Sequence, residues 1–166
     1  NEGKKGGAYS ANAYGIHPYV LLNHGESLTS VFTVAHEMGH AIHSYYSDKN
    51  QPYIYARYKI FVAEVASICN EILLIEYLLA NSTDKNERMF WLNHFMDTCK
   101  GKIFRQTMFA EFEMKVHRMV EAGESLTSRN VNELYLELNK KYFGPDMVCD
   151  EEISYEWERV PHFYTS

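Results

Sequence analysis

Residues 32–43 read FTVAHEMGHAIH and contain two histidines four positions apart, His36 and His40, with Glu37 directly after the first. On an α-helix, side chains four residues apart differ by about 40° in direction and lie about 6 Å apart along the axis. The two imidazoles can therefore reach one metal ion, and Glu37 can reach the water that this ion activates. The pattern His-Glu-x-x-His thus predicts a zinc site on a helix, with Glu37 as the general base of a metal-dependent hydrolase.

The third zinc ligand has to come from elsewhere, since a catalytic zinc takes three protein ligands and leaves one position open. In metzincins the motif continues with a glycine three residues after the second ligand and a histidine six residues after it. Those two positions hold His43 and Tyr46 here, which excludes the metzincin arrangement. We expect His43 to be a packed histidine beside the site and not a ligand.

Three glutamates lie in the apolar run over residues 60–80, namely Glu64, Glu71 and Glu76. Glu64 and Glu71 are seven residues apart and share one helical face within about 20°. Carboxylates on a buried face are costly unless they are paired or bind a metal. We therefore expect Glu64 to be the third ligand and Glu71 to accept the outer N–H of a ligand histidine, although the reverse assignment also fits. Glu76 falls off that face and is predicted to point to solvent.

The rest of the chain predicts a mainly α fold with a short β element at its N-terminal end. Glycine-rich residues 1–15 indicate a loop, and residues 17–22 indicate a short strand. Helical patterns follow at about 27–46, 56–79, 87–121 and 131–142, with a cap at Ser27 or Thr29 and an interruption at Gly101. We expect one zincin-like helical catalytic domain over residues 1–166.

Composition excludes several classes of partner. The net charge of −6 argues against nucleic acid as the main partner, because phosphate binding favours a basic surface. Glutamates inside the most apolar run argue against a membrane span. The three cysteines, Cys69, Cys99 and Cys149, are odd in number and widely spaced, which favours a reducing compartment such as the cytoplasm. The chain starts without methionine and ends without a clear stop signal, so we expect it to be part of a longer protein.

Six segments, in the same order along the chain, resemble the thimet oligopeptidase and oligoendopeptidase F family of zinc peptidases, with oligoendopeptidase F as the nearer branch. The segments are Gly3–Tyr9 (GKKGGAY), His17–Asn23 (HPYVLLN), Phe32–His43 (FTVAHEMGHAIH), Ala63–Ser67 (AEVAS), Phe104–Glu113 (FRQTMFAEFE) and Arg159–Tyr164 (RVPHFY).

The resemblance implies one zinc ion held by His36, His40 and Glu64, and short unfolded oligopeptides as substrates. It also implies that His162 lines the substrate cleft and stabilises the developing oxyanion, with Tyr164 as a weaker candidate for the same role. Family members carry a large helical region before this part and further tyrosines after it, which would belong to the remainder of the parent chain. The Gly3–Tyr9 loop and the following strand are candidates for binding the peptide backbone by edge pairing.

Two other functions remain open from the sequence. One is a non-catalytic helical interaction module that keeps zinc for stability. The other is a carboxypeptidase-like exopeptidase that uses the same site, because the walls of the cleft decide between internal and terminal cleavage.

Overall fold

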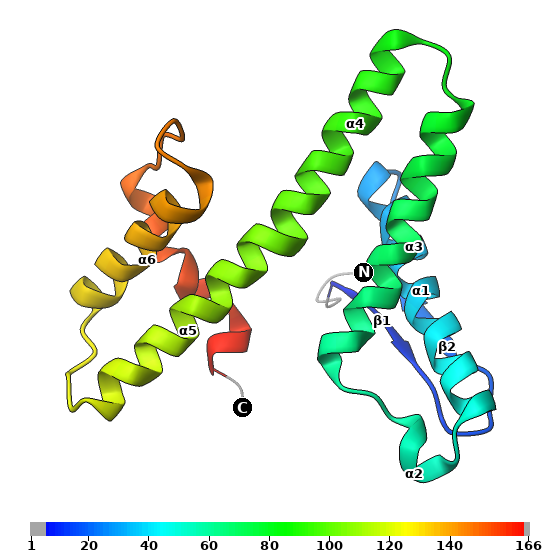
Figure 1. Cartoon of the computed structure of the whole chain (residues 1–166), viewed down its shortest axis with the longest axis horizontal. Coiled ribbons are helices and arrows are strands. Elements are labelled where there is room, and N and C mark those ends of the chain that lie inside the picture. The colour runs from blue at the N-terminus through cyan, green and yellow to red at the C-terminus, as the bar shows by residue number, and fades with distance from the viewer. Residues whose placement is uncertain (1–5, 165–166) are drawn as a thin grey trace. The chain divides into compact units, whose positions relative to one another are not determined.

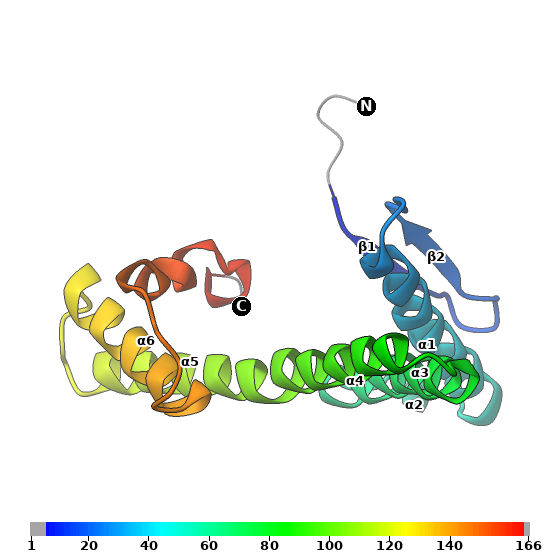
Figure 2. The same ribbon diagram turned by 90° about the horizontal axis from the view of Figure 1, so that it is seen from above.

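The computed structural model describes residues 6–164, and the fold is mainly α, as predicted (Figures 1 and 2). Contacts separate two compact units, which meet in sequence between Leu92 and Asn93. The single domain predicted over residues 1–166 stays a prediction, and each unit is described by itself below.

A small antiparallel sheet begins the first unit. Strand β1 (Ala8–Ala11) pairs with β2 (Tyr19–Leu22), with Ala8 opposite Leu22 and Ala11 opposite Tyr19. The sequence predicts β2, but the prediction of a loop over residues 1–15 is wrong at β1, where the backbone pairs despite the nearby glycines. Residues 1–5, which include the first three residues of the predicted Gly3–Tyr9 backbone-binding loop, lie outside the described residues.

Two long helices, the short helix between them and the start of the helix that follows form the rest of the first unit. Helix α1 (Leu28–Asn50) is capped by Ser27, whose side chain accepts a hydrogen bond from the Ser30 backbone N–H, as predicted. After the short helix α2 (Tyr53–Ala56), α3 (Ile60–Asn81) packs against α1 and buries Ala63, Ser67, Glu71 and Ile75. Both strands also contact α1, so α1 lies between the sheet and α3.

Helix α4 (Lys85–Cys99) starts at Asp84, whose carboxylate accepts from two backbone N–H groups. A π-helical turn, η1 (Lys100–Phe104), then leads into α5 (Arg105–Glu121). It lies at Gly101, where the sequence predicts an interruption, but the helix continues through it. Such turns add a residue to the helical ladder without ending the helix.

The second unit is built on α5 and α6 (Ser128–Phe143), the latter starting with a Thr127–Asn130 capping box. Its core consists of Met108, Phe112, Val131, Tyr135 and Leu138. Two 3-10 segments, η2 (Glu151–Arg159) and η3 (Pro161–Tyr164), follow α6. None of the described helices combines the length and apolar character that a bilayer crossing requires.

Candidate metal centre

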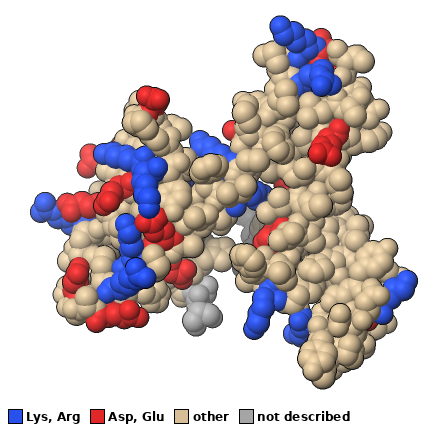
Figure 3. All heavy atoms as spheres, in the orientation of Figure 1, with Lys and Arg blue, Asp and Glu red and all other residues tan. Residues whose placement is uncertain are grey.

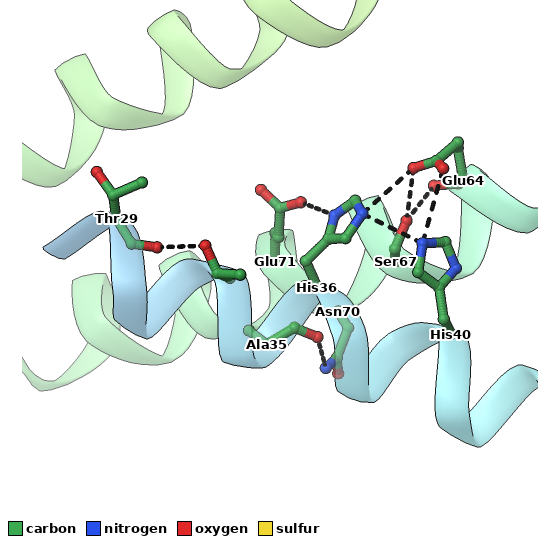
Figure 4. Close-up of polar contacts among 9 residues, drawn as sticks. Thr29, Ala35, His36, His40, Glu64, Ser67, Asn70 and Glu71 are labelled. Atoms are coloured by element: carbon green, nitrogen blue, oxygen red, sulfur yellow. Dashed lines mark hydrogen bonds and ion pairs between the residues drawn. The ribbon is translucent and has the colours of Figure 1, made fainter. Parts of the chain in front are cut away.

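The two histidines of the motif lie side by side on α1. Their rings are 4.7 Å apart and nearly perpendicular, and the Nε2 atoms of His36 and His40 approach to 3.2 Å (Figure 4). The helical spacing produces this convergence, because residues four apart occupy the same face one turn apart. Both imidazoles therefore present a nitrogen to the same point in space.

Helix α3 brings Glu64 to that point. Its Oε2 lies 3.4 Å from Nε2 of His36, and its Oε1 lies 3.6 Å from Nε2 of His40. Among the described residues, His36, His40 and Glu64 form the one group of three metal-binding side chains whose donor atoms all lie within 4.8 Å of one another. The sequence-predicted ligand set is thus assembled from two helices.

The donor spacing fits a zinc ion. Ligand atoms about 2.0–2.1 Å from a tetrahedral ion lie about 3.3 Å from one another. The two Nε2 atoms here are 3.2 Å apart, and the nearest Glu64 oxygens, Oε2 to His36 and Oε1 to His40, lie 3.4 and 3.6 Å away. Two imidazoles and one carboxylate are also a donor set of catalytic zinc sites, which keep a fourth position open. The residues present therefore fit the predicted metal in both chemistry and spacing.

Glu71 contacts His36 on the ring edge opposite the candidate metal position. Its Oε1 lies 2.5 Å from Nδ1 of His36, on the side of the ring away from Glu64 and His40, and its side chain is only 8% exposed. A carboxylate at this position fixes the tautomer in which Nε2 of His36 is free to bind a metal. Of the two assignments left open by the sequence, the geometry favours Glu64 as ligand and Glu71 as the partner of His36.

Sequence reasoning missed two polar residues of α3 beside the site. The fully buried Ser67 donates from Oγ to Oε2 of Glu64 at 3.1 Å, and Asn70 donates from Nδ2 to the carbonyl oxygen of Ala35 at 2.6 Å. The first contact restrains the carboxylate, and the second ties α3 to the turn that precedes His36. Their signal in the sequence was their spacing, three and six residues after Glu64 on the α1-facing side.

Gly39 allows the two helices to come this close. A Cβ on Gly39 would stand 2.7 Å from the Cα of Ser67 and 2.8 Å from the carbonyl oxygen of Ala66. Contacts this short do not occur, so a side chain here would push α3 away from α1. Glu64 and Glu71 both depend on that approach to reach the histidines.

The predicted general base, Glu37, is buried, with 7% of its surface exposed. It lines a cavity of about 340 Å³ together with the start of β1, the end of β2 and the hydroxyl residues at the N-terminal end of α1. These last residues are Ser27, Thr29, Ser30 and Thr33. Glu37 thus follows the candidate ligand His36 in the sequence, and it lines a cavity beside the two strands.

His43 is packed, as the sequence analysis expected. Its ring stacks on Tyr58 with centroids 3.8 Å apart and planes 15° apart. Burial, and secondarily the proximity of His40, lowers the pKa of His43 below its usual value. The stacked ring of His43 is outside the group of three candidate metal-binding side chains.

His162 and Tyr164 lie on η3, in the second unit. Both side chains are exposed, while Phe163 between them packs on Phe109 and Phe112 at centroid distances of 5.5 and 5.1 Å. The preceding residue Val160 is also buried. The segment is therefore anchored by its apolar residues, and it presents His162 and Tyr164 outward.

A buried carboxylate fixes the segment before η3. Glu156 accepts from the Tyr135 hydroxyl at 2.7 Å and from the guanidinium groups of Arg105 and Arg159, each at 2.5 Å. Three charge-assisted or hydroxyl donors compensate the cost of burying this group. The sequence analysis did not identify Glu156.

Known proteins similar to this chain are peptidases. The chain matches Peptidase family M3 over residues 1–166. It is 54% identical over 164 residues to Oligopeptidase PepF of Bacillus subtilis (strain 168), and 49% identical over 164 residues to the plasmid Oligoendopeptidase F of Lactococcus lactis subsp. cremoris. Each alignment covers 99% of this chain but only 24% and 27% of the respective relative.

A crystal structure of a protein from Chlamydophila abortus has the same fold, with a TM-score of 0.79 and 42% identity over 98% of this chain and 27% of that one. The fold, the residue cluster and these likenesses all point to one class of protein, the peptidases. The chain belongs to peptidase family M3, which confirms the resemblance to the oligoendopeptidase F branch. It spans about a quarter of the length of the curated relatives that it matches.

Proposed function

We propose that this chain carries the metal centre of a zinc-dependent endopeptidase that cleaves short, unfolded oligopeptides in the cytoplasm. The observation that carries the proposal is the convergence of His36 Nε2, His40 Nε2 and the Glu64 carboxylate to 3.2–3.6 Å, with Glu37 following His36 in the sequence. The names of the relatives support oligopeptides as the substrate class, and the three free cysteines support a reducing compartment.

His36, His40 and Glu64 would hold the zinc ion, which when bound would supply Lewis acidity and a water with a pKa lowered to about 7. Glu37 accepts the proton of the attacking water and delivers it to the leaving amine. Glu71 keeps His36 in the metal-binding tautomer, and Ser67 restrains the carboxylate of Glu64.

In this proposal His162 donates to the tetrahedral oxyanion, and Tyr164 is a second candidate donor. Their exposure on the anchored η3 segment is compatible with contact to a substrate. The resemblance to oligoendopeptidase F carries this assignment. The free edges of the small sheet are candidates for pairing with the peptide backbone.

The test uses the full-length protein and the variant Glu37→Gln, which keeps the shape of the side chain but removes its basicity. We expect the variant to bind zinc in the same ratio as the wild type, as measured by elemental analysis, while kcat falls by about 10²–10⁴-fold. Glu26→Gln, at an exposed position before α1, is the matched control and should cleave normally.

A quenched oligopeptide and mass spectrometry of its products separate the alternatives. Internal cleavage supports the endopeptidase. Stepwise release of terminal residues indicates the exopeptidase, and bound zinc without any cleavage by the wild type indicates the interaction module. Full activity of Glu37→Gln contradicts the assignment of the base.

A further inference from the structure

Helix α3 buries only one of its two apolar faces. The side that packs on α1 contains every fourth residue, and its buried members are Ala63, Ser67, Glu71 and Ile75. Two positions earlier the same spacing repeats on the opposite side of the helix. That side, the outer face of α3, consists of Phe61, Val65, Cys69, Leu73 and Tyr77.

Among the described residues of the first unit, no other element covers the outer face of α3. The exposed fractions are 85% for Phe61, 62% for Val65, 57% for Leu73 and 66% for Tyr77, and Cys69 is also exposed. Large apolar side chains in a row of this length are unusual on a protein surface that stays in water. Singly they would need no explanation, but here they follow one helix from end to end.

The outer face of α3 also has few charged residues. The helix has 22 residues without a lysine or arginine, and its charged residues are Glu64, Glu71 and Glu76. The first two serve the site on the other side, which leaves Glu76 as the charged residue near the outer face. In Figure 3 most charged side chains gather over α5, α6 and the C-terminal segments, and the surface over α3 is mainly uncharged. A helix whose outward side is also mainly apolar is typical of a protein interior.

We propose that the outer face of α3 is covered by the part of the same polypeptide that lies outside residues 1–166. The lengths of the relatives favour this occupant over a second copy, since the chain spans only 24% and 27% of the two curated relatives and 27% of the solved chain. A polypeptide of that size has a core large enough to take in a helix that is apolar on two sides. In the whole protein α3 is then an interior helix, with α1 on one side and the additional chain on the other.

The reactivity of the Cys69 thiol, at the centre of the outer face of α3, reports whether this face is accessible to solvent. The full-length protein is treated with N-ethylmaleimide under native conditions, at a concentration where light scattering shows a monomer, and modification of Cys69 is followed by mass spectrometry. We expect Cys69 to react at least about 100-fold more slowly than in the same protein unfolded in denaturant, because reaction requires local opening. Reaction of the native monomer at the rate of the unfolded protein overturns the proposal.

The concentration dependence separates the two occupants. If Cys69 stays protected from N-ethylmaleimide at protein concentrations too low for a dimer to form, the outer face of α3 is covered by the same polypeptide. Protection that is lost on dilution, in step with dissociation of a dimer, assigns the outer face to a second copy and also overturns the proposal.

A pair of variants at the same position gives a second measurement. Cys69→Ala and Cys69→Asp in the full-length protein are nearly equal in stability if the position faces water, because surface substitutions on a helix have small effects. We expect Cys69→Asp to lower the midpoint of thermal unfolding by several degrees relative to Cys69→Ala, since the carboxylate would be buried without a partner. Equal midpoints contradict the proposal. None of these measurements depends on peptidase activity, so the result stands apart from that of Glu37→Gln.

Discussion

Gly39 of α1 faces the backbone of Ser67 on α3 so closely that a Cβ on the glycine would stand 2.7 Å from the Ser67 Cα. The contact lies within the His-Glu-x-x-His motif and opposite the turn that follows Glu64. It sets the distance between the helix that carries the histidines and the helix that carries the two glutamates. The geometry of the candidate metal centre therefore depends on a residue that has no side chain to contribute.

Replacing Gly39 by Ala should separate the helices locally, because the added methyl group meets backbone atoms that cannot move aside. We expect a loss of about 1–3 kcal/mol in stability from overpacking, and a zinc affinity lower by about 10–100-fold. Thermal unfolding and competition with a metal chelator measure the two effects. Gly101→Ala is the control, because nothing lies within 4 Å of the place that its methyl group would take, and it should keep wild-type zinc affinity. Unchanged zinc binding by Gly39→Ala would show that the spacing of α1 and α3 does not limit the site.

Replacing Glu71 by Gln removes the negative charge that faces Nδ1 of His36. Zinc affinity should fall by about 10–100-fold, because the imidazole loses the partner that fixes its tautomer and raises its basicity. Equilibrium competition with a fluorescent zinc chelator gives the affinity. The exposed Glu76 on the same helix provides the control variant Glu76→Gln, which should bind zinc as the wild type does. If both variants bind zinc equally well, Glu71 has no role in holding His36.

Replacing His162 by Ala tests the proposed oxyanion donor. We expect kcat to fall by about 10²–10³-fold, with zinc content and KM nearly unchanged, because the lost hydrogen bond acts on the transition state. Steady-state kinetics on a quenched oligopeptide with the full-length protein measure both constants. His117→Ala, at an exposed position of α5, is the control and should leave kcat and KM unchanged. A variant that loses only substrate affinity would assign His162 to binding.

Acid should weaken the second unit through Glu111. Hydrogen bonds from Lys141 and Tyr142 lower the pKa of Glu111 to about 2, and Lys115 adds a smaller effect in the same direction. A carboxylate with a lowered folded-state pKa stabilises the fold above its unfolded pKa, about 4.5, and loses that effect as the pH falls toward 2. Glu111→Gln should therefore unfold at lower urea concentration than the wild type at pH 7, and the difference should shrink below pH 4.5.

Urea midpoints of the full-length wild type and variant between pH 3 and 7 give this comparison. Glu113→Gln, at an exposed position of the same helix, should leave the midpoint unchanged throughout. A difference between Glu111→Gln and the wild type that is constant with pH would contradict the ionic origin of the effect.

Much of the metal centre could be predicted because its elements are local. His36, Glu37 and His40 belong to one helix, where the spacing alone fixes the direction of each side chain. Glu64 was predicted by a different argument, the cost of a carboxylate on an apolar face, and the structure brings it to the histidines. The strand β1 was missed because glycine and small polar residues predict a loop, while pairing with β2 depends on a partner farther along the chain.

The sequence is sufficient for the helical class of the fold, the family and the motif that would hold a metal, because each of these depends on periodicity within single segments. The tertiary structure decided that Glu64 faces both histidines while Glu71 faces Nδ1 of His36, and it revealed the roles of Gly39, Ser67 and Asn70. The physical reason is that a helical repeat fixes directions within a helix, whereas the distance between two helices depends on which side chains meet at their contact.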